Sequence, residues 1–393
     1  MEGYRVIDLS EGVAGPYTAM ALGDADADVI KVESPEGDRA RGWGPPRQGD
    51  QGHFFLSVNR NKRGIVLDLA REEGRDVARR LLERADVVVV DPNRLPHPDL
   101  SYEAVGALNP QIVYRAISGF GDQGPWAGLP EVNCRRSWRR RRPQAARPIG
   151  EPPVRHGLDI ASMYSAVYSV QAVCAALLGR DRIGSGQRID VSLFAASLPC
   201  VRRSGWRCPI RTSGGASIWR ATPDRRTTAT AARTAASTSP GAYGPREVRR
   251  LAARPEDGMG EGRPTLPRAA NGHSRRGGQG GADGPPPVGP GAVTVLDRGG
   301  DIIERHGGLA FPMNDYKALV EDEQVQYLNM VQTIDQPGVG PIRVLAPPWQ
   351  FAETPAEVRL PAPRLGEHGR EILAELGLTP DAIDRLSAGA LGA

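Results

Sequence analysis

Cysteine and histidine are scarce in this 393-residue chain, and long apolar runs are missing. The four cysteines form no Cys-x-x-Cys pair and the six histidines stand singly, so neither a metal site nor a disulfide framework is expected. No run of about 18 apolar residues occurs, and no charged and then apolar leader opens the chain. We therefore expect a soluble cytoplasmic protein that has no bound metal and no membrane partner.

The basic charge of the chain comes from one short segment. Six arginines between Arg135 and Arg142 exceed the formal net charge of +4, which falls to −2 without them. Such a run can bind nucleic acid or a membrane surface. We favour instead an alternative reading frame of GC-rich DNA, with a genuine disordered insertion as the other possibility. No nucleic-acid partner is expected.

A second segment, Val201 to Ala292, has almost no hydrophobic periodicity. Between Arg254 and Ala292, 18 of 39 residues are Gly or Pro, which exceeds the roughly 25 to 30% typical of low-complexity sequence. We expect this segment to lack a compact core, and a shifted reading frame would explain it too. An inactive product of a frame-shifted gene is therefore one open alternative for the whole chain.

The N-terminal third alternates short β-rich runs with helical patterns such as Arg71 to Arg84. The β-rich runs are Tyr4–Leu9, Asp28–Glu33, Gly64–Leu69, Ala85–Val90 and Ile112–Ile117. This alternation predicts an α/β fold with a Rossmann-like parallel sheet and crossover helices. The first run leads through Ser10 to Pro16 into a helix, a geometry that places ligand phosphate or adenine near a helix N-terminus.

Asp159 stands at the entrance of an apolar helical pattern. Large apolar residues recur behind it at helical spacing and predict an inward-facing stripe: Ile160, Met163, Tyr164, Val167, Val170, Val173, Cys174, Leu177 and Leu178. Gly179 is the expected C-terminal stop. From the residues alone, Asp159 is either an N-terminal cap or first-turn acid, or a nucleophile.

Several separate motifs follow one another along the chain in a fixed order. They are Val6–Ser10 with Ala14–Pro16, Ala27–Glu33, Gly37–Trp43, Asn59–Arg63 with Leu67–Leu69, Ile117–Gly121, Arg155–Tyr164, Gly184–Gln187 and Arg364–His368. Together they resemble the family III CoA-transferases, also called the CaiB/BaiF family. The resemblance covers about 4–133, 150–199 and 307–378.

The resemblance implies a large CoA-binding domain that is built from both ends of the chain. Its N-terminal part would be 1–200. A degenerate region, 201–305, would replace most of a smaller middle domain. The end of that domain and the return to the large domain would be 306–393. In the family the subunits interlock, so the resemblance also implies an intertwined homodimer.

The resemblance further implies that CoA moves from an acyl-CoA donor to a carboxylic acid through a covalent intermediate on Asp159. CoA itself is a substrate, and no metal takes part. The implied CoA-binding positions are Val13, Ala14, Arg41, Leu67, Asp68, Leu69, Ala70, Asp91 and Asn93. Arg41 meets either a CoA phosphate or the carboxylates of Glu33 or Asp38. The family's usual Glu-Asn-Phe-Arg-Pro-Gly motif is replaced here by Val90-Asp-Pro-Asn-Arg-Leu95.

An α-methylacyl-CoA racemase-type enzyme is the closest alternative, since it shares the fold and the CoA site. That chemistry needs an acid and base pair within reach of one carbon. Those relatives carry a histidine near Val132 and an asparagine at about Arg155, and neither residue is present here. The transferase interpretation is therefore favoured.

Overall fold

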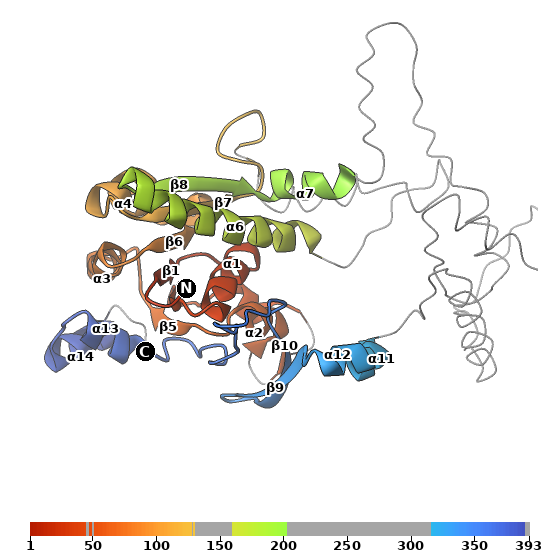
Figure 1. Ribbon diagram of the computed structural model, residues 1–393. Helices are drawn as coiled ribbons and strands as arrows, with labels where there is room; N and C mark the ends of the chain where they lie inside the picture. The colour runs from red at the N-terminus through yellow and green to blue at the C-terminus, as the bar shows by residue number, and fades with distance from the viewer. Residues whose placement is uncertain (45–46, 49–50, 128, 130–158, 203–315, 390–393) are drawn as a thin grey trace, which may run out of the picture. The chain divides into compact units, whose positions relative to one another are not determined.

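The computed structural model describes residues 1–44, 47–48, 51–127, 129, 159–202 and 316–389 (Figure 1). The chain forms two compact units, Met1–Gly215 together with Glu323–Ala393, and Ala216–Asp322. Only 316–322 of the second unit is described, with the helix α11 (Tyr316–Glu321). The arginine-rich segment and the low-complexity segment of the sequence analysis lie outside the described residues, except for the last two residues of α7.

Six parallel strands form the central sheet of the first unit, in the order β5-β2-β1-β6-β7-β8. Their bounds are β1 (Arg5–Asp8), β2 (Asp28–Glu33), β5 (Arg63–Val66), β6 (Val87–Val90), β7 (Val113–Ser118) and β8 (Gln187–Ser192). The register places Val6 beside Val29 on one side and Val87 on the other. The predicted Rossmann-like α/β fold is thus confirmed, and β8 adds a strand that the β-rich runs did not include.

Helices cover both faces of the sheet, because alternate strand residues point to opposite faces. In β6, Val88 and Val90 belong to a core with α3, α4, α13 and α14, whereas Val87 and Val89 belong to a core with α1, α6 and α7. The helices are α1 (Ala14–Asp24), α3 (Glu72–Glu83), α4 (Tyr102–Leu108), α6 (Ile160–Ile183), α7 (Leu193–Arg202), α13 (Gly369–Glu375) and α14 (Pro380–Gly389). Burial on both faces explains the unbroken run of valines in this strand.

The stripe predicted for α6 is confirmed only in part. Val173 and Leu177 are buried, and Val170 and Cys174 pack against the core partly buried. The other buried residues of the helix are small: Ala161, Ser162, Ser165, Ala166, Ser169 and Ala176. The large side chains of Met163, Tyr164, Val167 and Leu178 are exposed. Small residues permit close packing of α6 against α1 and the sheet, and the apolar residues around the rest of the helix gave a misleading period.

The predicted end of α6 is also wrong, since the helix continues through Gly179 and ends at Gly184, whose φ of 73° is left-handed. By length and composition α6 could cross a membrane. In the structure it packs against α1, α7, β7 and β8.

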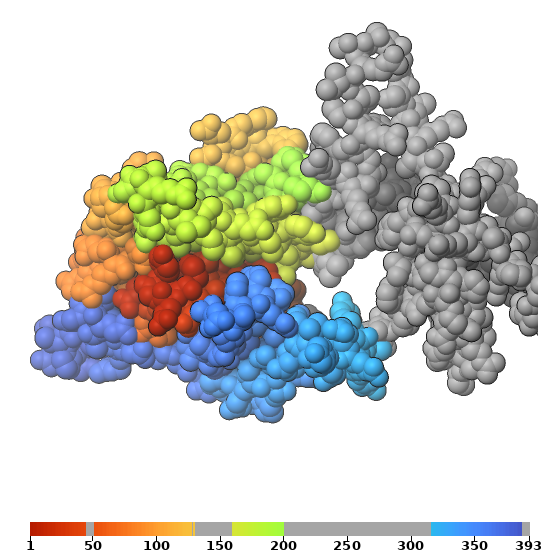
Figure 2. All heavy atoms as spheres, viewed as in Figure 1, coloured from red at the N-terminus to blue at the C-terminus, as the bar shows by residue number. Residues whose placement is uncertain are grey.

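The C-terminal segment returns to the first unit and packs against its N-terminal part. In Figure 2 the blue C-terminal atoms lie directly against the red N-terminal ones. The amide of His368 donates to the carbonyl of Gly64 at 2.9 Å, and the His368 Nδ1 accepts from the Gly64 amide at 3.1 Å. This pairing covers the backbone of β5, which would otherwise be an open sheet edge.

Short elements complete the first unit. The hairpin of β9 (Val331–Gln336) and β10 (Gly340–Leu345) is antiparallel, and its Ile342 packs with Phe55 of α2. The others are η1 (Arg39–Gly42), β3 (Arg47–Gln48), β4 (Gln51–Gly52), α2 (His53–Val58), η2 (Pro92–Arg94), η3 (Pro98–Leu100) and α12 (Glu323–Tyr327).

Candidate active site

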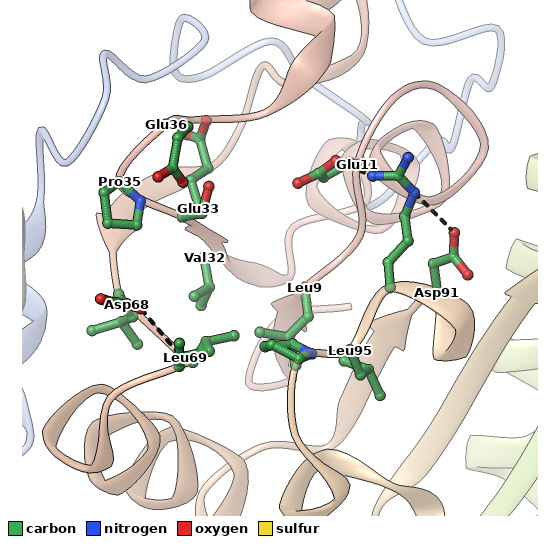
Figure 3. Close-up of a pocket in the computed structure, with 15 residues that line it drawn as sticks. Leu9, Glu11, Val32, Glu33, Pro35, Glu36, Asp68, Leu69, Asp91 and Leu95 are labelled. Carbon is green, nitrogen blue, oxygen red and sulfur yellow. Dashed lines mark hydrogen bonds and ion pairs between the residues drawn. The ribbon is translucent and has the colours of Figure 1, made fainter.

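A cavity of about 340 Å³ opens at the carboxyl ends of β1, β2, β5 and β6 (Figure 3). β1 and β6 are neighbours, yet the chain runs from β1 outward to β2 and β5 before it returns to β6. The strand order therefore reverses between them. Doubly wound sheets bind their ligands at this reversal, because the loops that leave the two strands diverge there.

Five of the sequence-predicted binding residues line this cavity. They are Leu67, Asp68, Leu69, Ala70 and Asp91. The first four follow β5 directly, and Asp91 follows β6. The Asp68 carboxylate accepts a hydrogen bond from the Ala70 amide at 3.0 Å, which fixes the turn before α3.

The other lining residues were not predicted. They are Leu9, Glu11, Val32, Glu33, Ser34, Pro35, Glu36, Arg94, Leu95 and Pro96. All of them lie at or just beyond the ends of the predicted strands, so their places in the sequence were a usable signal. In Figure 3, Glu33, Pro35 and Glu36 lie on one side of the cavity, and Glu11 and Asp91 lie on the other.

Beside this cavity, a fully buried ionic network joins the loops that form it. The Lys62 Nζ donates to Asp8 Oδ2 at 2.8 Å, and the Lys31 Nζ donates to Asp38 Oδ2 at 2.9 Å. The Asp38 carboxylate also accepts from the amide of Gly12 at 3.0 Å. Asp38 therefore holds the loop after β1 against the start of η1.

Burial and charge set the pKa values of this network in opposite directions. Burial lowers the pKa of Lys62 to about 8, and the nearby Lys31 ammonium adds to that effect. Burial opposes the charged form of Lys31 too, but Asp38 and Asp8 raise its pKa above the usual value. Burial likewise opposes ionisation of Asp8, yet the two lysines keep its pKa below the usual value. Lys31 and Asp8 are thus held in their charged forms.

Arg41 forms an ion pair inside the protein. Its Nε and Nη2 each contact a different oxygen of Glu33 at 2.7 Å, and its guanidinium lies 3.6 Å from the centre of the Phe55 ring. Its Nη2 also donates to the carbonyl of Pro363 at 3.0 Å. Of the two alternatives drawn from the sequence, a CoA phosphate or a carboxylate of Glu33 or Asp38, this arrangement is the ion pair with Glu33. Arg41 also joins the cavity wall to the C-terminal segment.

The remaining predicted binding residues lie near the cavity in sequence but not in its described lining. Val13 is the N-cap of α1 and Ala14 is its first residue, and both side chains are buried. Asn93 lies in η2, where its amide donates to the Asp91 carboxylate at 3.1 Å. That hydrogen bond orders the loop that carries Asp91 into the cavity wall.

Asp159 is the N-cap residue of α6. Its carbonyl accepts the amide of Met163 at 3.2 Å, whereas its carboxylate forms no capping hydrogen bond with the helix. Asp159 is partly buried. Asp159 is not among the described residues that line the cavity.

The described part of the chain holds no cluster of metal-binding side chains. No three side chains of His, Cys, Asp or Glu lie close enough there to hold an ion.

Comparison with known proteins shows which family the chain belongs to. The family model for CoA-transferase family III matches residues 1–222 and 297–369. The chain belongs to CoA-transferase family III. This confirms the resemblance drawn from the motifs, and the matched ranges leave out 223–296.

Two curated relatives illustrate the match. A succinate–glutarate CoA-transferase of Agrobacterium fabrum is 39% identical over 204 residues, which cover 49% of this chain and 51% of the relative. An acyl-CoA transferase of Fusarium pseudograminearum is 30% identical over 98% of this chain and 86% of the relative. The chain spans about half the length of the first of these and of the similar mouse and human succinyl-CoA:glutarate CoA-transferases.

A solved structure supports the fold. The crystal structure of a CAIB/BAIF family protein from Brucella suis superimposes with a TM-score of 0.65 at 27% identity, covering 95% of this chain and 98% of that chain. The family III chain described here therefore shares its architecture with a solved member of the CaiB/BaiF group.

Proposed function

We propose that this chain transfers CoA from an acyl-CoA donor to a carboxylic acid acceptor. In this proposal the nucleotide end of CoA occupies the cavity between the ends of β1 and β6, and Asp159 is the nucleophile. The observation that carries the proposal is the place of the cavity. It lies where the strand order reverses, and residues 67–70 and Asp91, chosen from the sequence, line it.

The lining suits the adenosine end of CoA. Leu9, Val32 and Leu69 offer apolar surface to a purine ring. The carboxylates of Asp68 and Asp91 can accept hydrogen bonds from an amino group or from ribose hydroxyls. The volume of about 340 Å³ lies in the range of small-molecule sites.

The proposed chemistry proceeds by attack of the Asp159 carboxylate on the thioester carbonyl of the donor. The C–S bond breaks, CoA leaves as a thiolate, and Asp159 carries the acyl group as a mixed anhydride. The thiolate then attacks the aspartyl carbonyl, which releases the donor acid and leaves an enzyme thioester. The acceptor carboxylate attacks that thioester, and the thiolate released attacks the new anhydride at the acceptor carbonyl. Acyl-CoA of the acceptor and free Asp159 result, so one difficult step is divided into easier ones.

Short dicarboxylic acids are the acceptors to test first. The names of several relatives specify succinate and glutarate, mesaconate or oxalate. Each of these acids carries a second carboxylate besides the one that would accept CoA. We therefore propose a dicarboxylate as the acceptor and the CoA thioester of a different dicarboxylate as the donor.

We also propose an intertwined homodimer in the cytoplasm. The side chains of Met163, Tyr164 and Val167 on α6 are 40 to 46% exposed. Three large apolar side chains on successive turns form a surface that a partner subunit would cover. Light scattering of the purified chain tests this, and a monomer at micromolar concentration would contradict it.

Asp159→Asn tests the nucleophile, because it keeps size and polarity but removes the attacking carboxylate. We expect acyl exchange to be abolished while CoA affinity, measured by calorimetry, stays within several-fold. Hydroxylamine added with acyl-CoA should modify residue 159 in the wild type only. Asp181→Asn, on an exposed turn of the same helix, is the matched control. Full turnover by Asp159→Asn without deamidation would rule out the covalent role.

A further inference from the structure

Acidic side chains outnumber basic ones in the lining of the cavity, and this affects which ligands the cavity can bind. Its described lining holds five carboxylates and a single cation, Arg94. The carboxylates belong to Glu11, Glu33, Glu36, Asp68 and Asp91. A nucleotide that carries phosphate groups would be repelled by such a lining unless a cation faced it. Arg41 already neutralises Glu33, and Arg94 is the one cation in the described lining that can face a phosphate directly.

Arg94 bridges two loops across the reversal of strand order. Its Nη1 lies 2.8 Å from Glu11 Oε2, in the loop after β1. Its Nε lies 3.6 Å from Asp91 Oδ2, at the end of β6. The three side chains therefore close the cavity on this side while they are 17 to 44% exposed. Exposed ion pairs of this kind contribute little to stability, so this bridge can open readily.

Glu11 has a second cation within reach. The Nε of Arg39 lies 3.9 Å from Glu11 Oε2, and the Arg39 guanidinium lies 5.2 Å from the centre of the Trp43 ring. Asp38 fixes both partners, since its carboxylate accepts the amides of Gly12 and Ala40 at 3.0 and 2.8 Å. Glu11 therefore lies between two arginines, and it keeps one of them if Arg94 moves away.

We propose that the Glu11–Arg94–Asp91 bridge is a latch that a nucleotide phosphate opens. Arg94 leaves Glu11 for a phosphate oxygen, and Glu11 remains paired with Arg39. A phosphate offers Arg94 more negative charge and a bidentate partner, so the exchange favours the bound state. This inference rests on the proposed function, and it adds Arg94 as the phosphate contact and Glu11 as its competitor.

Calorimetric titration of the full chain with CoA and with adenosine tests the latch. Arg94→Gln should weaken CoA binding by roughly 10- to 100-fold, because a charge-assisted hydrogen bond is lost. Glu11→Gln should tighten CoA binding by about 2- to 5-fold, because the competing carboxylate is gone. Adenosine has no phosphate, so its affinity should change less than about twofold in either variant.

Arg370→Gln is the charge-matched control, since Arg370 pairs with Asp384 on the exposed surface of α13 and α14. Wild-type affinity for CoA in Arg94→Gln would overturn the latch while leaving the proposed function intact. Weaker CoA binding in Glu11→Gln would also overturn it, because the bridge would then be structural. Failure of both the wild type and Arg370→Gln to bind CoA or adenosine would overturn the proposed function, and the latch with it.

Discussion

The central sheet carries two groups of ion pairs, one buried and the other exposed to solvent. Around the carboxyl end of β1, the side chains of Asp8, Lys31 and Lys62, which contact one another, are all 0% exposed. At the amino end, Arg63 contacts the carboxylates of Asp28, Glu371 and Glu375, which are 33 to 55% exposed. Water can replace a lost partner at the amino end but not at the carboxyl end.

The difference in exposure corresponds to a difference in the structural role of the two groups of ion pairs. The buried pairs fix the loops that form the cavity, and a buried charge without a partner is strongly unfavourable. The exposed pairs join β2 and β5 to α13, whose Ile372 and Leu373 are also buried in the apolar core, and exposed ion pairs contribute little to stability. The carboxyl end should therefore tolerate almost no change in charge, whereas the amino end should tolerate several.

Asp8→Asn should have the largest effect on stability. It leaves Lys62 and Lys31 buried with one fewer carboxylate, which destabilises a protein by about 3 to 5 kcal/mol. Urea unfolding measures this, with Asp384→Asn on the exposed surface as the control. A loss below about 1 kcal/mol would show that the buried network is not required.

Lys62→Met should show an effect that depends on pH. The pKa of Lys62 is about 8 in the folded chain against 10.5 ordinarily. Between these values the unfolded chain binds the extra proton, so the free energy of unfolding of the wild type should rise with pH. Relative to Lys62→Met, the rise should reach at most about 1.4 kcal/mol per pH unit.

Urea unfolding of both proteins from pH 7.5 to pH 10 provides the measurement for that comparison. The free energy of unfolding of the wild type should rise relative to that of the variant as the pH passes through the folded pKa of Lys62, which is about 8. If the difference between the two free energies of unfolding does not change with pH, Lys62 stays charged throughout. The buried ion pairs would then resemble the exposed ones in their response to pH.

Arg63→Gln should have the smallest effect. The exposed carboxylates that it leaves behind are solvated, so we expect a loss of about 1 kcal/mol or less in the free energy of unfolding. Raising the salt concentration should shrink the difference between the wild type and the variant. A loss comparable to that of Asp8→Asn would remove the distinction between the two ends of the sheet.

The sequence predicted the sheet well. Each of the five β-rich runs overlaps a strand of the sheet, and residues 67–70 follow the strand β5 directly. The bridge between Glu11 and Arg94 has no local signal, since 83 positions separate the two residues. Four large residues of α6, Met163, Tyr164, Val167 and Leu178, were wrongly predicted to be buried. Small residues make many of the contacts of this helix, and their burial depends on the neighbouring helix rather than on their own hydrophobicity.

The most direct test of the account is whether filling the cavity blocks CoA. Ala70 lines the cavity and is exposed, so Ala70→Trp adds bulk at the opening without disturbing the core. Ala107→Trp, at an exposed position of α4, is the matched control. We expect calorimetry to show at least about tenfold weaker CoA binding for Ala70→Trp alone, with unchanged thermal stability. Wild-type CoA affinity in a folded Ala70→Trp protein would contradict the placement of CoA between β1 and β6.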